Sequence, residues 1–419
     1  MQNMDQATKT PEQTAYEKRE KRIMDAIQLK KPDRIPVTAM FSFFPARYKG
    51  IPIRETMYDP DVMFDTWVDT LTEFAPDLSE NPFPMRHLGN LLETLDFKML
   101  KWAGHGLGDD VTYQFVDDEY MKADEYDDFL YDMTDYMMHK FWPRVFGALA
   151  PCANLPHFHD VICYYFGTLY AASLFSDEMV GMGNVLRKAA DHSNTILSYA
   201  GKFAQTMAQK GFPGNYGGAT QVPFDTLGDF LRGTKGLMLD MRRRPEKVMA
   251  AVDKLLPIMI RIGVSGAKRT GNPRVFIPLH KGVESFMSDA QYQKFYWPGF
   301  KALLDGLIDE GLYPCPLVEG AYDARVKYLA QVPPGKVCYH FENFNATLLK
   351  EELANVACVR GGIPVRILST GTPDEVKVQL DKLLAEMADV PGFMVDASTG
   401  LDEAKPECVR AMFSYMHQR

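Results

Sequence analysis

The second half of the chain alternates regularly between short apolar runs and longer amphipathic stretches. The apolar runs have the length of strands and lie near residues 214–221, 274–279, 312–318, 336–340, 355–363 and 392–396. Helical patterns alternate with them, at residues 224–239, 245–269, 288–310, 321–331, 346–353, 372–389 and 403–418. This alternation is typical of βαβ units, in which crossover helices join parallel strands. The sequence therefore predicts an α/β fold built around a parallel sheet.

The start of the chain carries a helix and a first strand. Residues 1–15 are polar and lack a hydrophobic period, so we expect a disordered tail there. A helical pattern begins near Glu17 and ends before Pro32, and Arg34–Met40 is predicted to form a strand. No repeat or linker divides the rest of the chain, which predicts a single domain over residues 16–419.

Between about residues 55 and 210 the sequence predicts mostly helices. Val111–Val116 is the exception, because its composition favours a hairpin or an edge strand. The acidic run that follows, Asp117–Asp128, is expected to be solvated surface.

Composition excludes several classes of function. The net charge of -9 argues against a nucleic-acid partner, because phosphate binding needs a basic surface. The six cysteines contain no CxxC pair, which favours a reducing, cytoplasmic location over a disulfide framework. Met1–Lys31 lacks the apolar segment of a secretory signal, and no run approaches the roughly 18 apolar residues of a membrane span. We therefore expect a cytoplasmic protein without a membrane or nucleic-acid partner.

Three residues near the predicted strand ends form a candidate zinc site. Glu319 and His340 stand at or just beyond two consecutive strands, and Cys358 lies on the next one. In a parallel barrel the carboxyl ends of the strands converge on one mouth. A carboxylate, an imidazole and a thiolate there would give zinc three ligands and leave one position open. The alternative is a Glu319–His340 hydrogen bond on a solvated rim.

Four segments resemble the uroporphyrinogen decarboxylase superfamily, which includes that decarboxylase and the corrinoid-dependent methyltransferases. These segments are Lys21–Val37, Gln221–Gly233, Gly361–Val376 and Phe393–Ser398. The resemblance spans roughly residues 20–418 and is weakest between 60 and 200. It implies a (β/α)8 TIM barrel with a helical N-terminal extension. Thr372 and Glu375 in the third segment also match a capping box, which predicts a helix start there.

Departures from the decarboxylase pattern shift the expected substrate. The loop that in the decarboxylase has the form Arg-Gln-Ala-Gly-Arg-Tyr is Phe43–Tyr48 here, so Arg47 remains while Phe43 replaces the first arginine. A tetrapyrrole with four carboxylates needs paired arginine donors. A mouth lined by aromatic side chains suits an apolar aromatic ligand instead, and the candidate substrate-binding residues are Phe41, Phe43, Phe44, Arg47, Phe83 and Tyr216.

The resemblance also guides the choice of zinc ligands. Where the methyltransferases that act on coenzyme M have a His-x-Cys pair, this chain has Leu317 and Glu319. The branch that demethylates phenyl methyl ethers has a glutamate and then a histidine 21 positions later, which Glu319 and His340 match. The additional upstream glutamate of that branch falls on Leu304. Cys358 is therefore the preferred third ligand, with Asp305 and His280 as alternatives.

The implied activity is a zinc-dependent O-demethylation. The enzyme would transfer the methyl group of a small methoxylated aromatic substrate to the cob(I)alamin of a partner corrinoid protein. Catalytic roles fall to His280, Glu319 and His340. Methyl transfer from an amine, sulfide or steroid, a decarboxylase, and a non-catalytic binding barrel remain alternatives, and a homodimer is one option for the oligomeric state.

Several other polar residues have less specific expected roles. Asp396, on the last predicted strand, is either a structural hydrogen-bond acceptor or a catalytic group. His157 and His159 flank Pro156 in an irregular region, where surface or capping roles are expected ahead of the alternative, metal binding. The remaining cysteines are expected to be small buried hydrophobic residues; they are Cys152, Cys163, Cys315, Cys338 and Cys408.

Overall fold

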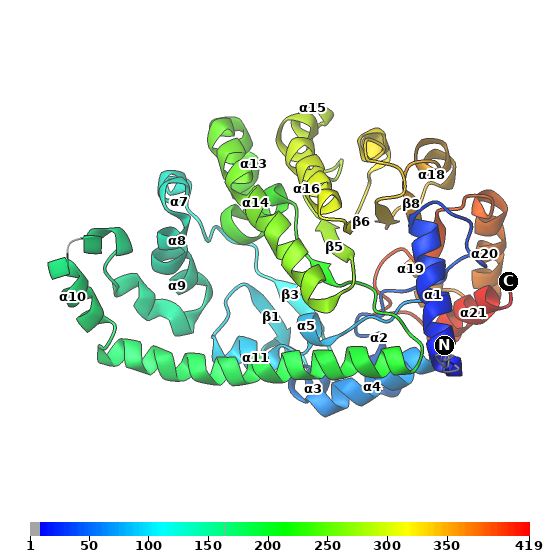
Figure 1. The fold of residues 1–419 in the computed structure, drawn as a ribbon, viewed down its shortest axis with the longest axis horizontal. Coiled ribbons are helices and arrows are strands. Elements are labelled where there is room, and N and C mark those ends of the chain that lie inside the picture. Colours follow the sequence, from blue (N-terminus) through cyan, green and yellow to red (C-terminus); the bar gives the residue numbers. More distant parts are fainter. Residues whose placement is uncertain (1–8, 163) are drawn as a thin grey trace, which may run out of the picture.

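A parallel sheet forms the centre of the protein (Figure 1). The structure is a computed structural model that describes residues 9–162 and 164–419. The sheet has the strand order β4-β5-β6-β7-β8-β9, and all neighbours are parallel. Its strands are β4 (Gly218–Ala219), β5 (Arg274–Leu279), β6 (Tyr313–Val318), β7 (Cys338–Phe341), β8 (Cys358–Ile363) and β9 (Phe393–Ala397). The predicted α/β fold with a parallel sheet is confirmed.

Helices follow the strands as the sequence pattern predicts. They are α12 (Pro223–Thr226), α13 (Gly233–Arg243), α14 (Pro245–Thr270), α15 (Asp289–Gln291), α16 (Trp297–Asp309), α17 (Val326–Leu329), α18 (Ala346–Leu353), α19 (Val365–Thr370), α20 (Pro373–Met387) and α21 (Pro406–His417). The predicted capping box of Thr372 and Glu375 starts α20. Short π-helical turns interrupt this series at η4 (Leu227–Arg232) and η5 (Tyr292–Tyr296), and a 3-10 turn forms η6 (Asp323–Arg325).

Two short segments connect the edges of the sheet. Val37 makes an isolated parallel bridge to Val395 on β9, and Ser79 makes another to Gly214, just before β4. The Asp77 amide donates to the Val37 carbonyl at 2.9 Å, which joins the two segments to each other. The predicted strand Arg34–Met40 is thus reduced to one bridge, because Pro36 within it has no N–H to extend a ladder.

The two faces of the strands have different partners. Val275, Ile277 and Leu279 of β5 belong to the large hydrophobic core that includes helices α14 and α16. The alternate residues face the other way, because side chains along a strand alternate between its two sides. They line the inner side of the sheet in rows that run across the strands. The row at the amino end contains Cys315, Cys338 and Cys358, and the row at the carboxyl end contains Glu319 and Glu342.

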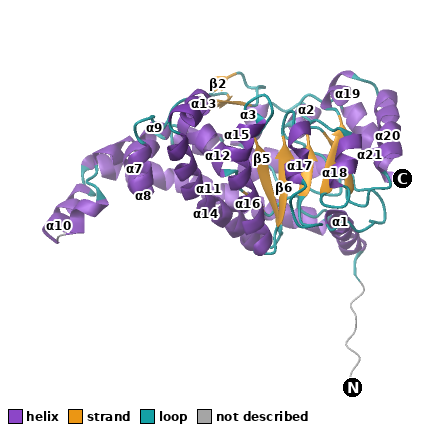
Figure 2. Ribbon diagram, turned by 90° about the horizontal axis from the view of Figure 1, so that it is seen from above, coloured by secondary structure: helices purple, strands orange, loops and turns teal. Residues whose placement is uncertain are grey.

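Helix α1 (Pro11–Ile27) closes the amino end of the sheet (Figure 2). Its Ile23 and Ile27 pack in one cluster with Cys315, Cys338 and Cys358. The helix begins at Pro11 because Thr10 and Gln13 form a capping box, so order starts before the predicted boundary at residue 16. The rest of that predicted tail, residues 1–8, lies outside the described residues.

Between α1 and residue 116 the chain forms shorter helices and a small second sheet. The helices are α2 (Phe44–Lys49), α3 (Ile53–Tyr58), α4 (Pro60–Phe74), α5 (Phe83–Arg86) and α6 (Gly89–Thr94). The strands β1 (Leu100–Ala103), β2 (Gly106–Leu107) and β3 (Tyr113–Phe115) form a separate three-stranded sheet. Because β3 pairs antiparallel with β1, the strand predicted at Val111–Val116 is confirmed.

A helical arm projects from the sheet (Figures 1 and 2). It contains α7 (Tyr126–Tyr131), α8 (Met133–Tyr136), η1 (Met137–Phe141), α9 (Trp142–Val145), η2 (Gly147–Asn154), η3 (Phe158–Ile162) and α10 (Tyr164–Ser173). The long helix α11 (Asp177–Gln209) returns from the far end of the arm to the sheet. Among the described residues, none of the helices is both long and apolar enough to cross a membrane.

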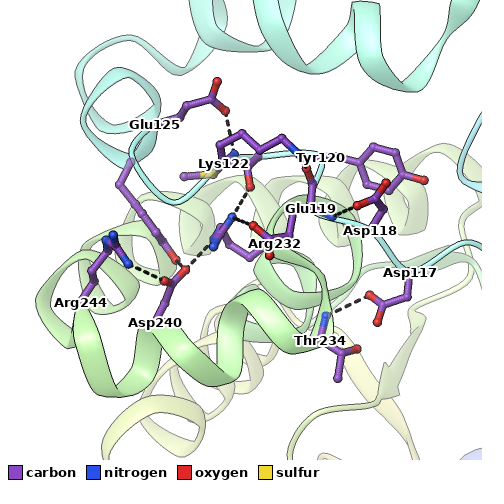
Figure 3. Close-up of polar contacts among 12 residues, drawn as sticks. Asp117, Asp118, Glu119, Tyr120, Lys122, Glu125, Arg232, Thr234, Asp240 and Arg244 are labelled. Atoms are coloured by element: carbon purple, nitrogen blue, oxygen red, sulfur yellow. Dashed lines mark hydrogen bonds and ion pairs between the residues drawn. The ribbon is translucent and has the colours of Figure 1, made fainter.

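A charged joint fixes the arm to η4 and α13 (Figure 3). Arg232, almost fully buried, donates to Asp240 at 2.5 Å and to Glu119 at 3.2 Å. On the arm side, Arg144 donates to both oxygens of Glu125, at 2.6 and 2.7 Å. The expectation that Asp117–Asp128 is solvated surface is therefore wrong for Glu125, which is 8% exposed because a guanidinium compensates its charge.

Candidate functional site

Three acidic or basic side chains meet at the carboxyl ends of adjacent strands. His280 follows Leu279 at the end of β5, Glu319 follows Val318 at the end of β6, and Glu342 follows Phe341 at the end of β7. Leu279 pairs with Val318, and Val318 pairs with Phe341, so the three following residues lie at the same level. We call this group and its neighbours the mouth of the sheet.

Asp229 orients the imidazole of His280. Its Oδ2 lies 2.5 Å from His280 Nδ1, and its other oxygen lies 3.1 Å from the ammonium of Lys281. Gln221 donates a further hydrogen bond to the same carboxylate. With Nδ1–H committed to Asp229, Nε2 of His280 points the other way and lies 3.8 Å from Glu319 Oε2. A carboxylate that holds one ring nitrogen while the other stays available is the usual arrangement behind metal-bound histidines.

Asp225 holds the backbone of the same loop. It accepts hydrogen bonds from the amides of His280 and Lys281, at 3.2 and 2.7 Å, and from the Tyr296 hydroxyl at 2.7 Å. Burial raises the pKa of Asp225 to about 6, and the nearby charge of Asp229 adds to the effect. These contacts fix the main chain on which His280 stands.

Negative charge dominates the electrostatics of the mouth. Burial raises the pKa of Glu319. The charge of His280 opposes this rise, and the charge of Glu342 adds to it. Burial alone would lower the pKa of His280, but the hydrogen bond and charge of Asp229, with Asp225 and Glu319, raise it to about 9. Four carboxylates thus face the two cationic side chains of His280 and Lys281. Such an excess of carboxylates favours binding of a cation.

Two side chains at the mouth are potential zinc ligands. His280 Nε2 and the Glu319 carboxylate are both partly exposed, with side-chain accessibilities of 35% and 41%. Imidazole nitrogen and carboxylate oxygen are ordinary zinc ligands, and a site with few protein ligands keeps positions open for substrate. Glu342, whose Oε2 accepts from the Gly320 amide at 2.7 Å, is the next carboxylate along the strand ends, but its oxygens do not lie within 4.8 Å of both other ligand atoms, so a third ligand would require a side-chain movement.

The structure does not bring Glu319, His340 and Cys358 together. His340 precedes Glu342 by two residues, so it lies about 7 Å below the level of Glu319. Its Nε2 is bonded to the Ala397 carbonyl at 2.8 Å, and burial lowers its pKa. His340 is therefore an interior residue, which corrects its assignment as a ligand beside Glu319.

Cys358 lies at the opposite end of the sheet from the mouth. It is the first residue of β8 and pairs with Cys338, four residues below the level of Glu319 and about 13 Å away along the strand. Helix α1 covers it, and burial raises the pKa of its thiol. Its assignment as the third ligand is corrected for these reasons. Cys152, Cys315, Cys338 and Cys408 are buried as predicted, whereas Cys163 lies outside the described residues.

Asp305, the other alternative ligand, lies away from the mouth. It stands on α16 and forms an ion pair with Lys301 four residues earlier on the same helix. Of the two alternatives, only His280 reaches Glu319.

Below the mouth, a buried polar network crosses the interior. Arg360 donates to Asp396 at 2.6 Å, and the Thr38 hydroxyl donates to the same oxygen of Asp396 at 2.6 Å. Arg360 also contacts the amide oxygen of Asn215 and the hydroxyl of Tyr216, both at 3.2 Å. Oδ2 of Asp396 is thus a structural hydrogen-bond acceptor, whereas its Oδ1 is buried without a hydrogen-bond partner among the described residues, and Tyr216 lies within this interior network.

Most of the predicted aromatic lining belongs to the core instead. Phe41 stacks on Phe413 of α21 at 5.9 Å between ring centroids, and Phe44 stacks on Tyr48 at 5.7 Å. Phe83 packs against Tyr199 and Phe203 of α11. All three phenylalanines are fully or almost fully buried. Their assignment to the substrate site is corrected, because outer helices rather than the mouth receive these rings.

Arg47 also lies outside the mouth. It is on α2, where its guanidinium lies 2.9 Å from Glu403 and contacts the Asp110 carbonyl at 3.2 Å.

Phe43 and Arg86 stand on the side of the mouth covered by the small sheet. Phe43 contacts Tyr113 of β3 at 6.2 Å between centroids, and the guanidinium of Arg86 lies 5.9 Å from the Phe43 ring. Tyr113 is within electrostatic reach of both Arg86 and Glu319. Arg86 is 6% exposed and donates to Glu80 at 2.6 Å, yet its Nε and Nη1 have no partner among the described residues. Two such buried donors could receive an anionic group of a ligand.

Sequence reasoning missed Asp225, Asp229, Glu342 and Arg86. A signal existed for the two aspartates, because they are four residues apart in Gln221–Gly233, immediately after β4. Nothing in the sequence indicated that Asp229 would contact a histidine 51 positions later.

Comparisons with known proteins give the fold. No protein-family model matches the chain, and no curated protein matches it. A solved structure of a methyltransferase from Methanosarcina mazei is similar, with a TM-score of 0.62 and 13% sequence identity. The match covers 96% of this chain and 98% of that one. At this level of identity, the likeness shows a shared fold.

Proposed function

We propose that the protein is a zinc-dependent methyltransferase that demethylates a methyl aryl ether. The methyl group would pass to the cob(I)alamin of a separate corrinoid protein. The observation that carries the proposal is the pair of His280 and Glu319 at the mouth, with Asp229 behind the imidazole. The similar fold of a structure named as a methyltransferase supports the same class of reaction.

His280 and Glu319 would hold the zinc ion, with Glu342 as the nearest further ligand. When bound there, zinc would supply a Lewis acid for the ether oxygen, which is a poor leaving group without one. Asp229 keeps the Nδ1 proton on His280, so zinc would bind at Nε2 in place of the second ring proton. Asp225 fixes the backbone of the His280–Lys281 turn, so the ligand geometry is set before substrate binds.

The side of the mouth around Phe43 would receive the substrate. Phe43 is itself fully buried against Trp67 and Tyr113, so the partly exposed ring of Tyr113 would offer the apolar surface there. The unpartnered donors of Arg86 favour a substrate that carries an anionic substituent, such as the carboxylate of a methoxybenzoate. This arrangement supports a compact aromatic ether over a tetrapyrrole, which would need several arginine partners.

The proposal includes a closed (β/α)8 architecture. Six strand positions come from β4 to β9, and the bridges at Val37 and Ser79 support two more. The strand positions at Val37 and Ser79 would then lie side by side between β9 and β4. The mouth would lie at the carboxyl ends of the strands, where (β/α)8 barrels have their active sites.

The direct test is a methyl-transfer assay with the purified zinc-loaded protein, free cob(I)alamin and a methoxybenzoate or methoxyphenol. Loss of cob(I)alamin absorbance together with formation of the phenol is the expected result. Methyl transfer from a methylated amine or sulfide but from no ether would replace the substrate class. Release of carbon dioxide from a tetrapyrrole carboxylate without methyl transfer would support the decarboxylase alternative.

A further inference from the structure

A second group of metal-ligating side chains lies on the arm, far along the chain from the mouth. Asp135 stands on α8, His139 on η1, and His157 between η2 and η3. Their ligand atoms all lie within 4.8 Å of one another. Among the described residues, no other three histidine, cysteine, aspartate or glutamate side chains converge so closely.

Asp135 is the centre of the group. Both of its carboxylate oxygens lie 2.8 Å from His157 Nδ1, and Oδ1 lies 3.0 Å from His139 Nδ1. Asp135 and His139 are four residues apart, so one face of the continuous helix α8–η1 presents both. His157 arrives from the irregular segment that follows Leu155.

The hydrogen bonding of His139 leaves its Nδ1 facing the other two side chains of the group. Its Nε2 lies 3.0 Å from the Leu155 carbonyl, an arrangement in which Nε2–H donates. Nδ1 is then the ring nitrogen that faces the group, and it lies 3.0 Å from the Asp135 carboxylate and 3.0 Å from the Asp135 carbonyl. A metal ion would take the place of a proton between Nδ1 and the carboxylate.

We propose that Asp135, His139 and His157 bind a divalent transition-metal ion, with Zn²⁺ the best match for two imidazoles and one carboxylate. This set resembles in composition the two-histidine, one-carboxylate sites that leave a fourth position for water. The two separations from Asp135, now 2.8 and 3.0 Å, would widen to about 3.3 Å, the edge of a tetrahedron with bonds near 2.0 Å, and the two histidine nitrogens already lie within 4.8 Å of each other. The Leu155 carbonyl already supplies the outer-shell partner that metal-bound histidines usually have.

The position of the ion gives it a structural role. It would tie the helix α8–η1 to the segment between η2 and η3, where 3-10 turns provide few regular backbone ladders. Asp135 and His139 are largely buried, with side-chain accessibilities of 15% and 6%, whereas His157 is 47% exposed and leaves a route for the ion. The site is independent of the function proposed for the mouth.

Zinc titration of the full-length protein tests the proposal. Competition with a chromophoric chelator would measure affinity, and elemental analysis would measure zinc per chain, for the wild type, His157→Ala, Asp135→Asn and the control His105→Ala. His105 is an exposed histidine that stacks on Trp102 outside the group. Limited proteolysis with and without zinc would measure whether the ion orders the arm.

We expect His157→Ala and Asp135→Asn each to lose one zinc per chain, or to bind it more than 100-fold more weakly, while His105→Ala matches the wild type. Zinc should slow cleavage within residues 137–162 in the wild type but not in His157→Ala. Because His157 is half exposed, this variant should fold even where a His139 variant does not. Unchanged zinc number and affinity in His157→Ala would overturn the proposal.

The variant Glu319→Gln separates this site from the mouth. If both sites bind zinc, each single variant loses one ion and the double variant loses both. If only the arm binds, Glu319→Gln retains the wild-type zinc content, which counts against the mouth and leaves the arm site intact.

Discussion

The mouth and the joint both concentrate charge, but they balance it in opposite ways. Burial works to raise the pKa of Glu125 in the joint, yet Arg144, the Lys122 amide and Tyr136 outweigh it and lower the pKa to about 2. Burial and a neighbouring carboxylate instead raise the pKa of Asp225 in the mouth to about 6. A carboxylate with a guanidinium partner stabilises the fold, whereas a crowded one costs stability until a cation binds. The joint therefore contributes stability, and the mouth is the region for which we propose binding.

One short segment links the two regions. The π-helical turn η4 carries Asp229, which faces the mouth, and Arg232, which faces the joint. π-Helical turns within helices often occur at functional sites. The joint thus anchors the same turn that orients His280.

The largest expected effect is on catalysis at the mouth. Glu319→Gln and His280→Ala should each lower kcat/KM for methyl transfer by about 10³-fold or more, because loss of a Lewis acid costs several kcal/mol at the transition state. Glu310→Gln, which removes an exposed carboxylate paired with Lys268, is the matched control and should retain activity. Full activity in both mouth variants would place the chemistry elsewhere.

Breaking the joint should affect stability instead. Asp240→Asn leaves the buried Arg232 guanidinium without its closest carboxylate. We expect the free energy of unfolding to fall by about 3–5 kcal/mol, as for other broken buried pairs. Urea unfolding would measure this loss, and the zinc content of the folded variant should remain that of the wild type. A stable variant that loses zinc would contradict the division between the two regions.

The Glu125 carboxylate predicts a pH dependence with a definite sign. Its folded pKa of about 2 lies below the ordinary value of 4.5, so its contribution is present above pH 4.5 and disappears as the pH falls toward 2. Glu125→Gln should lower the free energy of unfolding by about 2–3 kcal/mol at pH 7. The difference from the wild type should shrink as unfolding is measured at pH 5, 4 and 3. A constant difference would show that packing, rather than charge, accounts for the effect.

A smaller effect is expected for Asp229, which contacts His280 but would not bind the metal itself. Asp229→Asn retains the size of the side chain but removes the negative charge behind His280. Zinc affinity at the mouth should fall about 10- to 100-fold, as for other outer-shell partners of metal-bound histidines. Measuring it in a His157→Ala background removes the arm site from the titration. An unchanged affinity would mean that His280 is not a ligand.

The strands after residue 270 could be predicted because their sequences carry the information locally. Strands buried on both faces give continuous apolar runs, and β5 to β9 lie within two or three residues of their predicted bounds. The first strand was harder to predict. Pro36 has no N–H to donate, so only Val37 forms a bridge, and which neighbouring strand it meets is not written in the local sequence. The arm's helices could be predicted as helices, but not their projection from the sheet.

The site could be predicted only in part, because spacing does not fix the level of a residue within a sheet. The strand predicted at 355–363 in fact starts at Cys358, which places the thiol at the amino end rather than near the mouth. Glu319 and His280 follow directly after strands, so their position at the mouth was recoverable. Phe41, Phe44 and Phe83 illustrate the reverse, because helices distant in sequence bury them.

The most direct test is whether zinc binds at the carboxyl end of the sheet, where His280 and Glu319 lie, or at the amino end, where Cys358 lies. Zinc per chain would be measured in a His157→Ala background for His280→Ala, Glu319→Gln, His340→Ala and Cys358→Ser, with X-ray absorption on the parent. We predict one zinc with only nitrogen and oxygen neighbours, lost in the first two variants and retained in Cys358→Ser and in folded His340→Ala. Sulfur neighbours, or zinc that persists without His280 and Glu319, would contradict this prediction.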